Sequence, residues 1–253
     1  MKISVITCTW NSEPYLAESI NSVLAQDYSD IEYIFVDGGS TDGTLELIAA
    51  ISRPITVVNN VRGGISHAMN EGIKVATGDI VAHLHSDDYY LQQNVLSQVA
   101  KAMADHKVGW CFGRIKRLIE GKLVPEGYVA PAYSEKRLNR GNFIPHPATF
   151  VRRDWINMAG RFDEKLKYAM DYDLWLKLAK MGQPAELNMP LAAFREHGGS
   201  LSSSNRQAAM DEDYKVRLSH SSSNPLQLIE HKLRYWVRRR RLAKTLLQQS
   251  API

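Results

Sequence analysis

Cysteine and long apolar runs are the two features that this 253-residue sequence has least of. Its two cysteines, Cys8 and Cys111, lie in apolar segments without metal-binding spacing. We therefore expect buried, inert thiols in a protein from a reducing compartment. No apolar run approaches the roughly 18 residues that a membrane-spanning helix needs. Because Met1-Lys2 leads straight into a strand pattern and not into a signal peptide, we expect a cytoplasmic protein.

The positive charge is concentrated at one end of the chain. The formal net charge is +4, with 44% hydrophobic and 23% charged residues, which is ordinary for a folded globular protein. Seven Lys or Arg residues and one acid follow Pro225, so this tail carries about +6 and the rest of the chain about −2. The basic character is therefore local, and no nucleic-acid partner is expected.

The first half of the chain alternates strand and helix patterns. Apolar, β-rich runs lie at residues 3–8, 31–36, 56–58 and 80–84, with a helix pattern after each of the first three. This order predicts an α/β fold with a Rossmann-like, mostly parallel central sheet and helices on both faces. Polar loops follow all four strands, so we expect them to meet at one sheet edge as a nucleotide-binding crevice. These loops are residues 7–11, 37–42, 62–64 and 85–88.

Two adjacent carboxylates, Asp87 and Asp88, follow the fourth strand pattern. Neighbouring carboxylates repel each other unless a cation holds them, and hard divalent cations prefer oxygen ligands. One interpretation is a Mg²⁺ or Mn²⁺ site that carries a phosphorylated substrate. The alternative is that these residues cap the following helix.

The glycine motifs of the common nucleotide-binding folds are missing. Neither G-x-G-x-x-G nor G-x-x-x-x-G-K-[ST] follows the first strand. The chain instead has Arg62, Gly63 and Gly64 before a helix pattern, where backbone N–H groups and a guanidinium can approach an anion. A plain turn is the alternative.

The second half is predicted to hold a helix at 91–104, a strand at 108–112, a hairpin at 115–124, a long loop at 125–142 and a last strand at 187–194. His146 lies between two prolines. We expect it to be either a substrate contact or a structural polar residue. Asp171 and Asp173 fall in the first turn of another helix. Since residues i and i+2 point apart, only one of them can face a cleft. Helix capping is the alternative.

Three motifs together resemble the inverting family 2 glycosyltransferases of the GT-A fold, including those of bacterial surface polysaccharides. They are the segments 5–11, 37–44 and 85–88, in the order and spacing of that family. The resemblance covers roughly residues 1–205. It implies a glycosyltransferase domain at 1–220, with a nucleotide-sugar-binding half at 1–105 and an acceptor-binding half at 106–220.

The resemblance also implies roles for single residues. Asp87 would be a metal ligand with Asp88 supporting it, and His85 stands where the family commonly has its first Asp. His197 would complete the metal site in a segment that closes over the diphosphate; a surface histidine is the alternative. The other donor contacts, for a nucleoside-diphosphate sugar of which UDP is the expected base, would be Thr7, Thr9, Asn11, Asp37, Arg62, Gly64 and Ser86.

Asp171 matches the catalytic base of the family, while Met170 replaces the Glu that usually precedes it. The expected reaction is a single in-line displacement in which Asp171 deprotonates the acceptor hydroxyl. No Ser-His or Cys-His arrangement suggests a covalent nucleophile. The expected enzyme is a hexosyl- or N-acetylhexosaminyl-transferase of surface-polysaccharide or lipid-linked oligosaccharide synthesis. Two alternatives remain: a nucleotidyltransferase, and a non-catalytic partner subunit that binds nucleotide-sugars.

A basic amphipathic helix is predicted at 225–253, after a Ser-rich linker. Apolar residues recur there at steps of three or four, among them Leu226, Ile229, Leu233 and Trp236, beside the run Arg238 to Arg241. This pattern is typical of a peripheral helix on an anionic membrane, here the inner face of the cell membrane. The alternative is a helix that packs on the domain or on a second subunit, as in a homodimer.

Overall fold

The computed structural model describes residues 1–125, 132–198, 205–221 and 225–249. Within these residues, nine strands form one sheet in the order β3-β2-β1-β4-β8-β6-β9-β5, and β7 pairs with β6. The strands are β1 (Ile3–Thr9), β2 (Ile31–Asp37), β3 (Thr56–Val58), β4 (Ile80–His83), β5 (Tyr89–Tyr90), β6 (Trp110–Ile119), β7 (Lys122–Pro125), β8 (Thr149–Arg152) and β9 (Ala185–Glu196).

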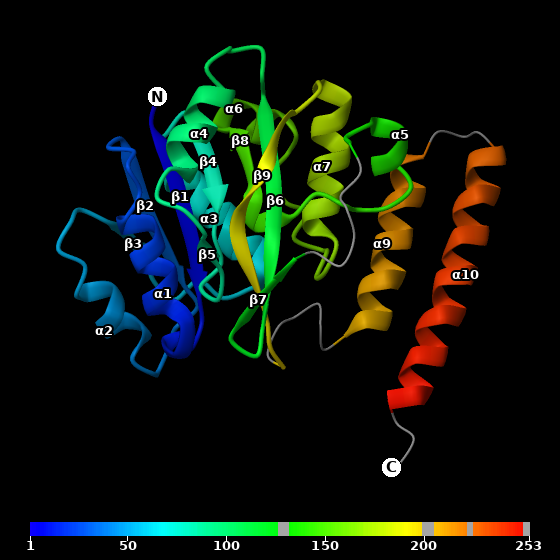
Figure 1. The fold of residues 1–253 in the computed structure, drawn as a ribbon, viewed down its shortest axis with the longest axis horizontal. Helices are drawn as coiled ribbons and strands as arrows, with labels where there is room; N and C mark the ends of the chain where they lie inside the picture. Colours follow the sequence, from blue (N-terminus) through cyan, green and yellow to red (C-terminus); the bar gives the residue numbers. More distant parts are fainter. Residues whose placement is uncertain (126–131, 199–204, 222–224, 250–253) are drawn as a thin grey trace.

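Helices flank the sheet, and the last two extend the molecule beyond α7 (Figure 1). α9 packs between α7 and α10, so the C-terminal pair is joined to the sheet layers through α7. The helices are α1 (Glu13–Leu24), α2 (Thr44–Ala49), α3 (Ile65–Val75), α4 (Val95–Ala102), α5 (Glu135–Leu138), η1 (a 3₁₀ turn, His146–Ala148), α6 (Arg153–Met158), α7 (Met170–Met181), α9 (Arg206–His220) and α10 (Pro225–Gln249).

The sheet is parallel from β3 to β4, as predicted, and mixed beyond β4. β8 runs antiparallel to β4, with Phe150 opposite Ala82 and Arg152 opposite Ile80. β8 therefore begins where β4 ends, and the segment before it lies at the carboxyl edge of the parallel strands. β6 is antiparallel to β8, and β9 is parallel to β6, so β9 also ends at that edge. This reversal brings two later segments of the chain to the predicted crevice.

Alternate side chains of the central strands supply two apolar layers, one on each face of the sheet. On β1, Ile3 and Val5 join the layer that includes residues of α1 and α4, while Ile6 joins the layer that includes residues of α3 and α7. Each large apolar side chain buried in this way contributes about 1.5–3 kcal/mol to folding. Cys8 and Cys111 are buried and unbridged as predicted, and burial raises the pKa of both thiols.

Two local expectations are tested by the backbone. The hairpin around Glu120-Gly121 is confirmed: both residues have positive φ, 48° and 76°, which a tight turn between β6 and β7 requires. The helix predicted at 91–104 is shorter in the structure, since α4 begins only at Val95. Tyr89 and Tyr90, just before the predicted helix, form β5 and pair with β9.

Two other predicted features fall partly outside the described residues. The long loop at 125–142 includes residues 126–131, and residues 199–204 follow His197 in the segment expected to close over the diphosphate. Over the part of the chain that the structure describes, no helix combines the length and apolar character needed to cross a bilayer.

Candidate active site

The loop that follows β2 is folded around the carboxylate of Asp37. One carboxylate oxygen accepts hydrogen bonds from the backbone N–H groups of Gly39 and Ser40, both at 2.8 Å. The other accepts from the hydroxyls of Thr9 at 2.8 Å and Ser40 at 2.6 Å. Burial alone would raise the pKa of Asp37, but these hydrogen bonds lower it below its usual value. Asp37 is thus held as an anion at the carboxyl end of β2.

The three polar residues predicted around β1 have different surroundings. Thr9 bonds to Asp37, and Asn11 accepts the Thr41 N–H at 2.9 Å with its own backbone at φ 49°. Thr7 is fully buried, and its hydroxyl donates to the Leu84 carbonyl at 2.8 Å. The hydroxyl of Thr7 therefore ties β1 to the loop after β4, and its contact with the nucleotide stays a prediction.

Arg62 and Gly64 lie where β3 leads into α3. A methyl group added to Gly39 would be 3.2 Å from Nη2 of Arg62, so the guanidinium lies directly beside the Asp37 loop. Gly64 caps the N-terminus of α3 with φ 96°, and, apart from its own helix backbone and chain neighbours, no atom of the described residues lies within 4 Å of the place where its Cβ would be. A glycine in this conformation leaves the helix N-terminus open, as an anion site requires.

Asp87 and His197 meet across the carboxyl edge of the sheet. Oδ2 of Asp87 lies 3.0 Å from Nε2 of His197, and both side chains keep about a quarter of their surface exposed, 27% and 24%. The ring of His197 also packs on Tyr15 of α1, with 4.9 Å between ring centroids. Ser86 precedes Asp87 in the same half-buried loop. Two residues 110 positions apart are thus brought into contact.

Asp88 faces away from that contact. Its Oδ1 accepts the backbone N–H of Arg195 at 3.0 Å, while the Arg195 guanidinium donates to the Asp87 carbonyl at 3.0 Å and pairs with Glu18. Burial, and then the neighbouring Asp87, raise the pKa of Asp88 well above its usual value, although Arg195 opposes this. Asp88 thus connects the Asp87 loop to β9, while its Oδ2 is buried with no hydrogen-bond partner among the described residues, and its role as a metal ligand stays a prediction.

The donor set at Asp87 and His197 fits a divalent cation. A carboxylate oxygen and an imidazole nitrogen are ligands that Mn²⁺ accepts, and Mg²⁺ commonly binds through one or two carboxylates plus substrate phosphates. Among the described residues, no group of three or more His, Cys, Asp or Glu side chains is arranged to hold a metal. The two side chains therefore suit an ion that takes its other ligands from a diphosphate and water.

Asp171 lies in the first turn of α7. Its carboxylate accepts the Tyr172 N–H at 2.6 Å and the Asn142 amide at 3.2 Å. Burial raises the pKa of Asp171 to about 7; repulsion from Asp213 adds to this, and the two hydrogen bonds oppose it. Asp173 faces elsewhere, toward His220 at 2.7 Å and Lys177 at 2.6 Å. The two acids therefore point apart, as their spacing predicts.

His146 is packed among other rings. Its ring is stacked on His85 with 4.8 Å between centroids and an interplanar angle of 6°, and it lies 6.0 Å from Trp175 of α7. Both ring nitrogens are buried with no hydrogen-bond partner within the described ranges. Burial, and then His85 and His83, lower its pKa well below its usual value. His146 therefore joins the Asp87 loop to α7, and its contact with the acceptor stays a prediction.

Sequence patterns missed three residues of this site. Trp10 is 70% exposed directly after β1 and lies against Gly38, which leaves room for the ring. An aromatic residue at a strand end, next to two polar loops, was the available signal. Arg195 and Asn142 gave no local signal, since their partners are 107 and 29 residues away in sequence.

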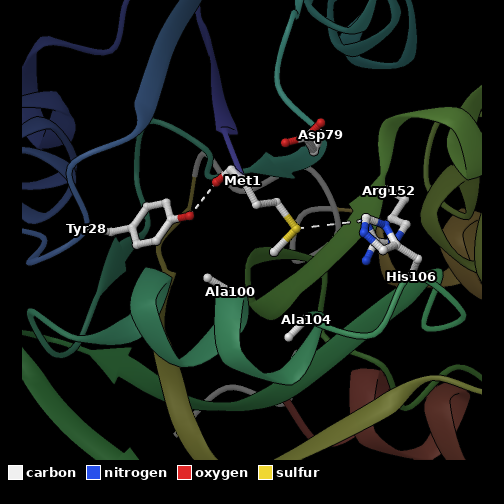
Figure 2. Close-up of a pocket in the computed structure, with 7 residues that line it drawn as sticks. All are labelled: Met1, Tyr28, Asp79, Ala100, Ala104, His106 and Arg152. Atoms are coloured by element: carbon white, nitrogen blue, oxygen red, sulfur yellow. Dashed lines mark hydrogen bonds between the residues drawn. The ribbon is translucent and has the colours of Figure 1, made fainter.

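A separate hollow of about 450 Å³ lies at the opposite edge of the sheet (Figure 2). Met1 precedes β1 and Asp79 precedes β4, whereas the site residues follow the ends of these strands. Arg152 is held there by the carbonyls of Val108, Met103 and Asp105. The hollow is lined by Met1, Tyr28, Asp79, Ala100, Ala104, His106 and Arg152. It is therefore not part of the candidate site.

Two named relatives are similar to this chain over most of its length. A chondroitin synthase of Pasteurella multocida is 30% identical over 191 residues, which is 74% of this chain and 20% of that protein. The Escherichia coli protein named UDP-Glc:alpha-D-GlcNAc-diphosphoundecaprenol beta-1,3-glucosyltransferase WfaP is 29% identical over 205 residues, 79% of each chain. The chain spans between 19% and 28% of the length of the first synthases that it matches.

Solved structures share the fold. TarS of S. aureus in complex with UDP-GlcNAc superposes with a TM-score of 0.72 at 23% identity, over 94% of this chain and 73% of that one. A mannosyltransferase of Pyrobaculum calidifontis in complex with GDP-Man and Mn²⁺ superposes with a TM-score of 0.68 at 20% identity, over 92% and 73%. These similarities confirm the predicted GT-A fold. The model of the family named glycosyl transferase family 2 matches residues 4–157, and this chain therefore belongs to that family.

Proposed function

We propose that this chain is an inverting glycosyltransferase that moves a sugar from a nucleoside-diphosphate sugar to an acceptor hydroxyl. One observation carries the proposal. A metal-compatible pair, Asp87 and His197, and a carboxylate with a pKa of about 7, Asp171, are connected through the stacked rings of His85 and His146. Leaving-group stabilisation and general-base catalysis are the two tasks that sugar transfer requires.

In the proposed reaction, Asp171 takes the proton of the acceptor hydroxyl. The acceptor oxygen attacks the anomeric carbon while the bond from that carbon to the diphosphate breaks on the opposite face, so the configuration is inverted. A divalent cation at Asp87 and His197 would offset the negative charge that develops on the diphosphate. Arg62 and the N-terminus of α3 at Gly64 would hold the same anion. A base with a pKa near 7 is half ionised at neutral pH, which suits proton transfer.

A UDP-sugar is the proposed donor. Thr9, Asn11 and Asp37 would position its base and ribose, and the exposed ring of Trp10 offers a surface on which a base can stack. The complex of TarS with UDP-GlcNAc supports this choice of base. The proposed acceptor is a glycan or a lipid-linked sugar of surface-polysaccharide synthesis, supported by the names of the relatives.

The first experiment is a thermal-shift series with UDP-, GDP-, dTDP- and CMP-sugars, each with and without Mn²⁺. A ligand that binds only the folded state raises the melting temperature. We expect one nucleotide class to stabilise the protein in a Mn²⁺-dependent way, and Asp87→Ala to abolish this shift. Asp79→Ala is the matched control, because Asp79 bonds to Lys2 at the opposite sheet edge. No shift with any sugar would contradict the donor site.

The outer face of α10 is proposed to lie on an anionic membrane surface. Leu226, Leu233 and Trp236 are 76%, 60% and 50% exposed, and they fall on one side of the helix. Lys232 and Arg241 flank them on the same helix, and the guanidinium of Arg240 lies over the ring of Trp236, 3.4 Å from its centroid. The inner side is polar, since Tyr235 donates to Asp211 of α9 at 2.8 Å. An apolar outer face with basic flanks is typical of interfacial helices. A peripheral location on the inner membrane face would present a lipid-linked acceptor to the enzyme.

A further inference from the structure

The C-terminal helices α9 and α10 contact both segments that hold Asp171. One segment is the turn after α5, where Asn142 donates to the Asp171 carboxylate at 3.2 Å. The other is residues 167–169, which lead directly into α7. The helices lie outside residues 4–157, where the family model matches, so nothing in that model assigns them a role.

α9 fixes both segments through their backbones. The Glu212 carboxylate accepts three successive N–H groups, those of Lys167, Tyr168 and Ala169, at 2.5 to 3.1 Å. Arg217 is 1% exposed and donates to the carbonyl of Arg140 at 3.0 Å. The backbone on either side of the Asn142–Asp171 contact is thus tied to one helix.

α10 reaches the same turn with two charged residues. Glu230 pairs with Arg140 at 2.8 Å. Arg238 lies on Gly141: a methyl group added to this glycine would be 2.9 Å from Nη2 and 3.1 Å from Nη1. Only glycine leaves this space, and Gly141 is the residue that precedes Asn142. The guanidinium therefore packs one residue away from the amide that holds Asp171.

The charges around Tyr172 and Asp213, the two groups next to Asp171, are mixed. Asp213 and Arg217 come from α9, Arg238 comes from α10, and the phenol of Tyr172 lies on α7. Burial raises the pKa of Asp213, and both arginines lower it. Asp213 in turn repels Asp171. Removing Arg238 would raise the pKa of Asp213 further, and loosening Asn142 would take away a hydrogen bond that lowers the pKa of Asp171.

We propose that Arg238 is a positioning residue for Asp171. Its guanidinium packs on Gly141 and so keeps Asn142 beside the carboxylate of Asp171. Together with Arg217, it also offsets the negative charge of Asp213. The C-terminal helix, whose outer face we propose for the membrane, then also completes the acceptor side of the site. The catalytic meaning of this inference rests on the proposed role of Asp171 as base; the contact itself does not.

The test measures the titration of Asp171 in the full-length protein without any ligand. Because the folded pKa of Asp171 is raised, its stabilising effect is complete at low pH and is lost as pH rises through about 7. The melting temperature of the parent minus that of its Asp171→Asn variant therefore falls as pH rises toward about 7, and it levels off above that pH. The midpoint of this levelling-off reports the pKa of Asp171 in the folded protein. The same difference is measured in backgrounds of Arg238→Gln, Arg238→Lys and Gly141→Ala. The control background is Arg239→Gln, which removes the same charge next to Tyr235.

We expect Arg238→Gln to move the midpoint of this levelling-off upward by roughly half a pH unit, a small shift because Arg238 is partly in water. Gly141→Ala, which displaces the guanidinium but keeps its charge, should move the midpoint less, and Arg238→Lys should restore most of the parent value. Arg239→Gln should leave it in place. Identical midpoints in the Arg238→Gln and Arg239→Gln backgrounds would overturn the inference. If Arg238→Gln does not fold, identical midpoints in the Gly141→Ala and Arg239→Gln backgrounds would overturn it instead.

A second readout separates this inference from the proposed function. With the UDP-sugar that stabilises the protein as donor, the acidic limb of the transfer rate should move upward together with the midpoint. If the midpoint moves but Asp171→Asn retains transfer, Arg238 does position Asp171 and the role of Asp171 as base is wrong.

Discussion

Two carboxylates of this protein, Asp37 and Asp171, show opposite shifts in pKa from the same starting value. Asp37, at the end of β2, accepts four hydrogen bonds, and its pKa is lowered. Asp171, at the start of α7, accepts the Tyr172 N–H and the Asn142 amide, and burial raises its pKa to about 7. Four donors offset the burial of Asp37, whereas two donors do not offset the burial of Asp171 and the repulsion from Asp213.

The difference fits the proposed roles, in which Asp37 stays charged and Asp171 exchanges a proton. In the half proposed to bind the donor, a permanent anion organises a loop on which the nucleotide would rest. In the half proposed to bind the acceptor, a carboxylate with few partners would take a proton at neutral pH. Changing either residue should therefore affect different properties of the protein.

The largest effect is expected for Asp171→Asn. Removing the base should lower the transfer rate by about 10²–10⁴-fold. The Mn²⁺-dependent thermal shift with the donor should remain, because Asp171 is proposed to touch only the acceptor. The measurement is initial-rate kinetics beside the thermal-shift series. Transfer at the parent rate would show that another group is the base.

Asp37→Asn should affect folding more than chemistry. An amide cannot accept all four hydrogen bonds, and each buried donor left unpaired costs about 1–3 kcal/mol. Urea denaturation at pH 7 should give a free energy of unfolding lower by about 2 kcal/mol. Since the folded pKa of Asp37 is lowered, its contribution is present above about pH 4 and lost as pH falls further. Parent and variant should therefore converge in acid, and a constant difference at all pH values would contradict this account.

The rate of transfer should depend on pH through Asp171. Below about pH 7 an increasing fraction of Asp171 is protonated, so the rate at saturating donor should fall toward tenfold per pH unit. The stability of the protein should change in the opposite direction over the same range, because the protonated form is the one that burial favours. A flat rate between about pH 5 and pH 8 would contradict the assignment.

His146→Phe should have a small effect. The ring contacts with His85 and Trp175 are kept, and the two nitrogens that Phe lacks have no partner among the residues that the structure describes. We expect the free energy of unfolding to stay within about 1 kcal/mol of the parent, whereas His146→Ala should cost about 2–4 kcal/mol through a cavity. A rise in acceptor KM for the Phe variant, at unchanged donor KM, would support the predicted contact of His146 with the acceptor.

The same comparison explains how far the sequence alone could predict the structure. The donor half is built from contacts over short loops: Asp37 closes on Gly39 and Ser40, and its motif is visible in the sequence. The burial of Thr7 could not be predicted, because the sequence does not distinguish a buried threonine at a strand end from one that binds a ligand.

The acceptor half depends on contacts between distant residues. Asp171 is identified by its resemblance to a family motif, but its partner Asn142 is 29 residues away, and the helices that hold both segments follow α7. The antiparallel direction of β8 was equally hidden, since it follows from strand pairing and not from periodicity. Local patterns therefore predict the parallel half of the sheet better than the mixed half.

The smallest effect on the folded enzyme is expected on the outer face of α10. Leu233→Ser removes an apolar side chain that is 60% exposed, so the melting temperature should not change measurably. Binding to vesicles that contain anionic lipid should weaken by roughly fivefold, because about 1 kcal/mol of apolar burial is lost. Leu45→Ser on α2, where the leucine is 38% exposed, is the matched control and should bind vesicles like the parent. Equal vesicle binding by all three proteins would mean that the outer face of α10 serves another contact, and a lower melting temperature for Leu233→Ser alone would indicate that this face packs against a second copy of the chain.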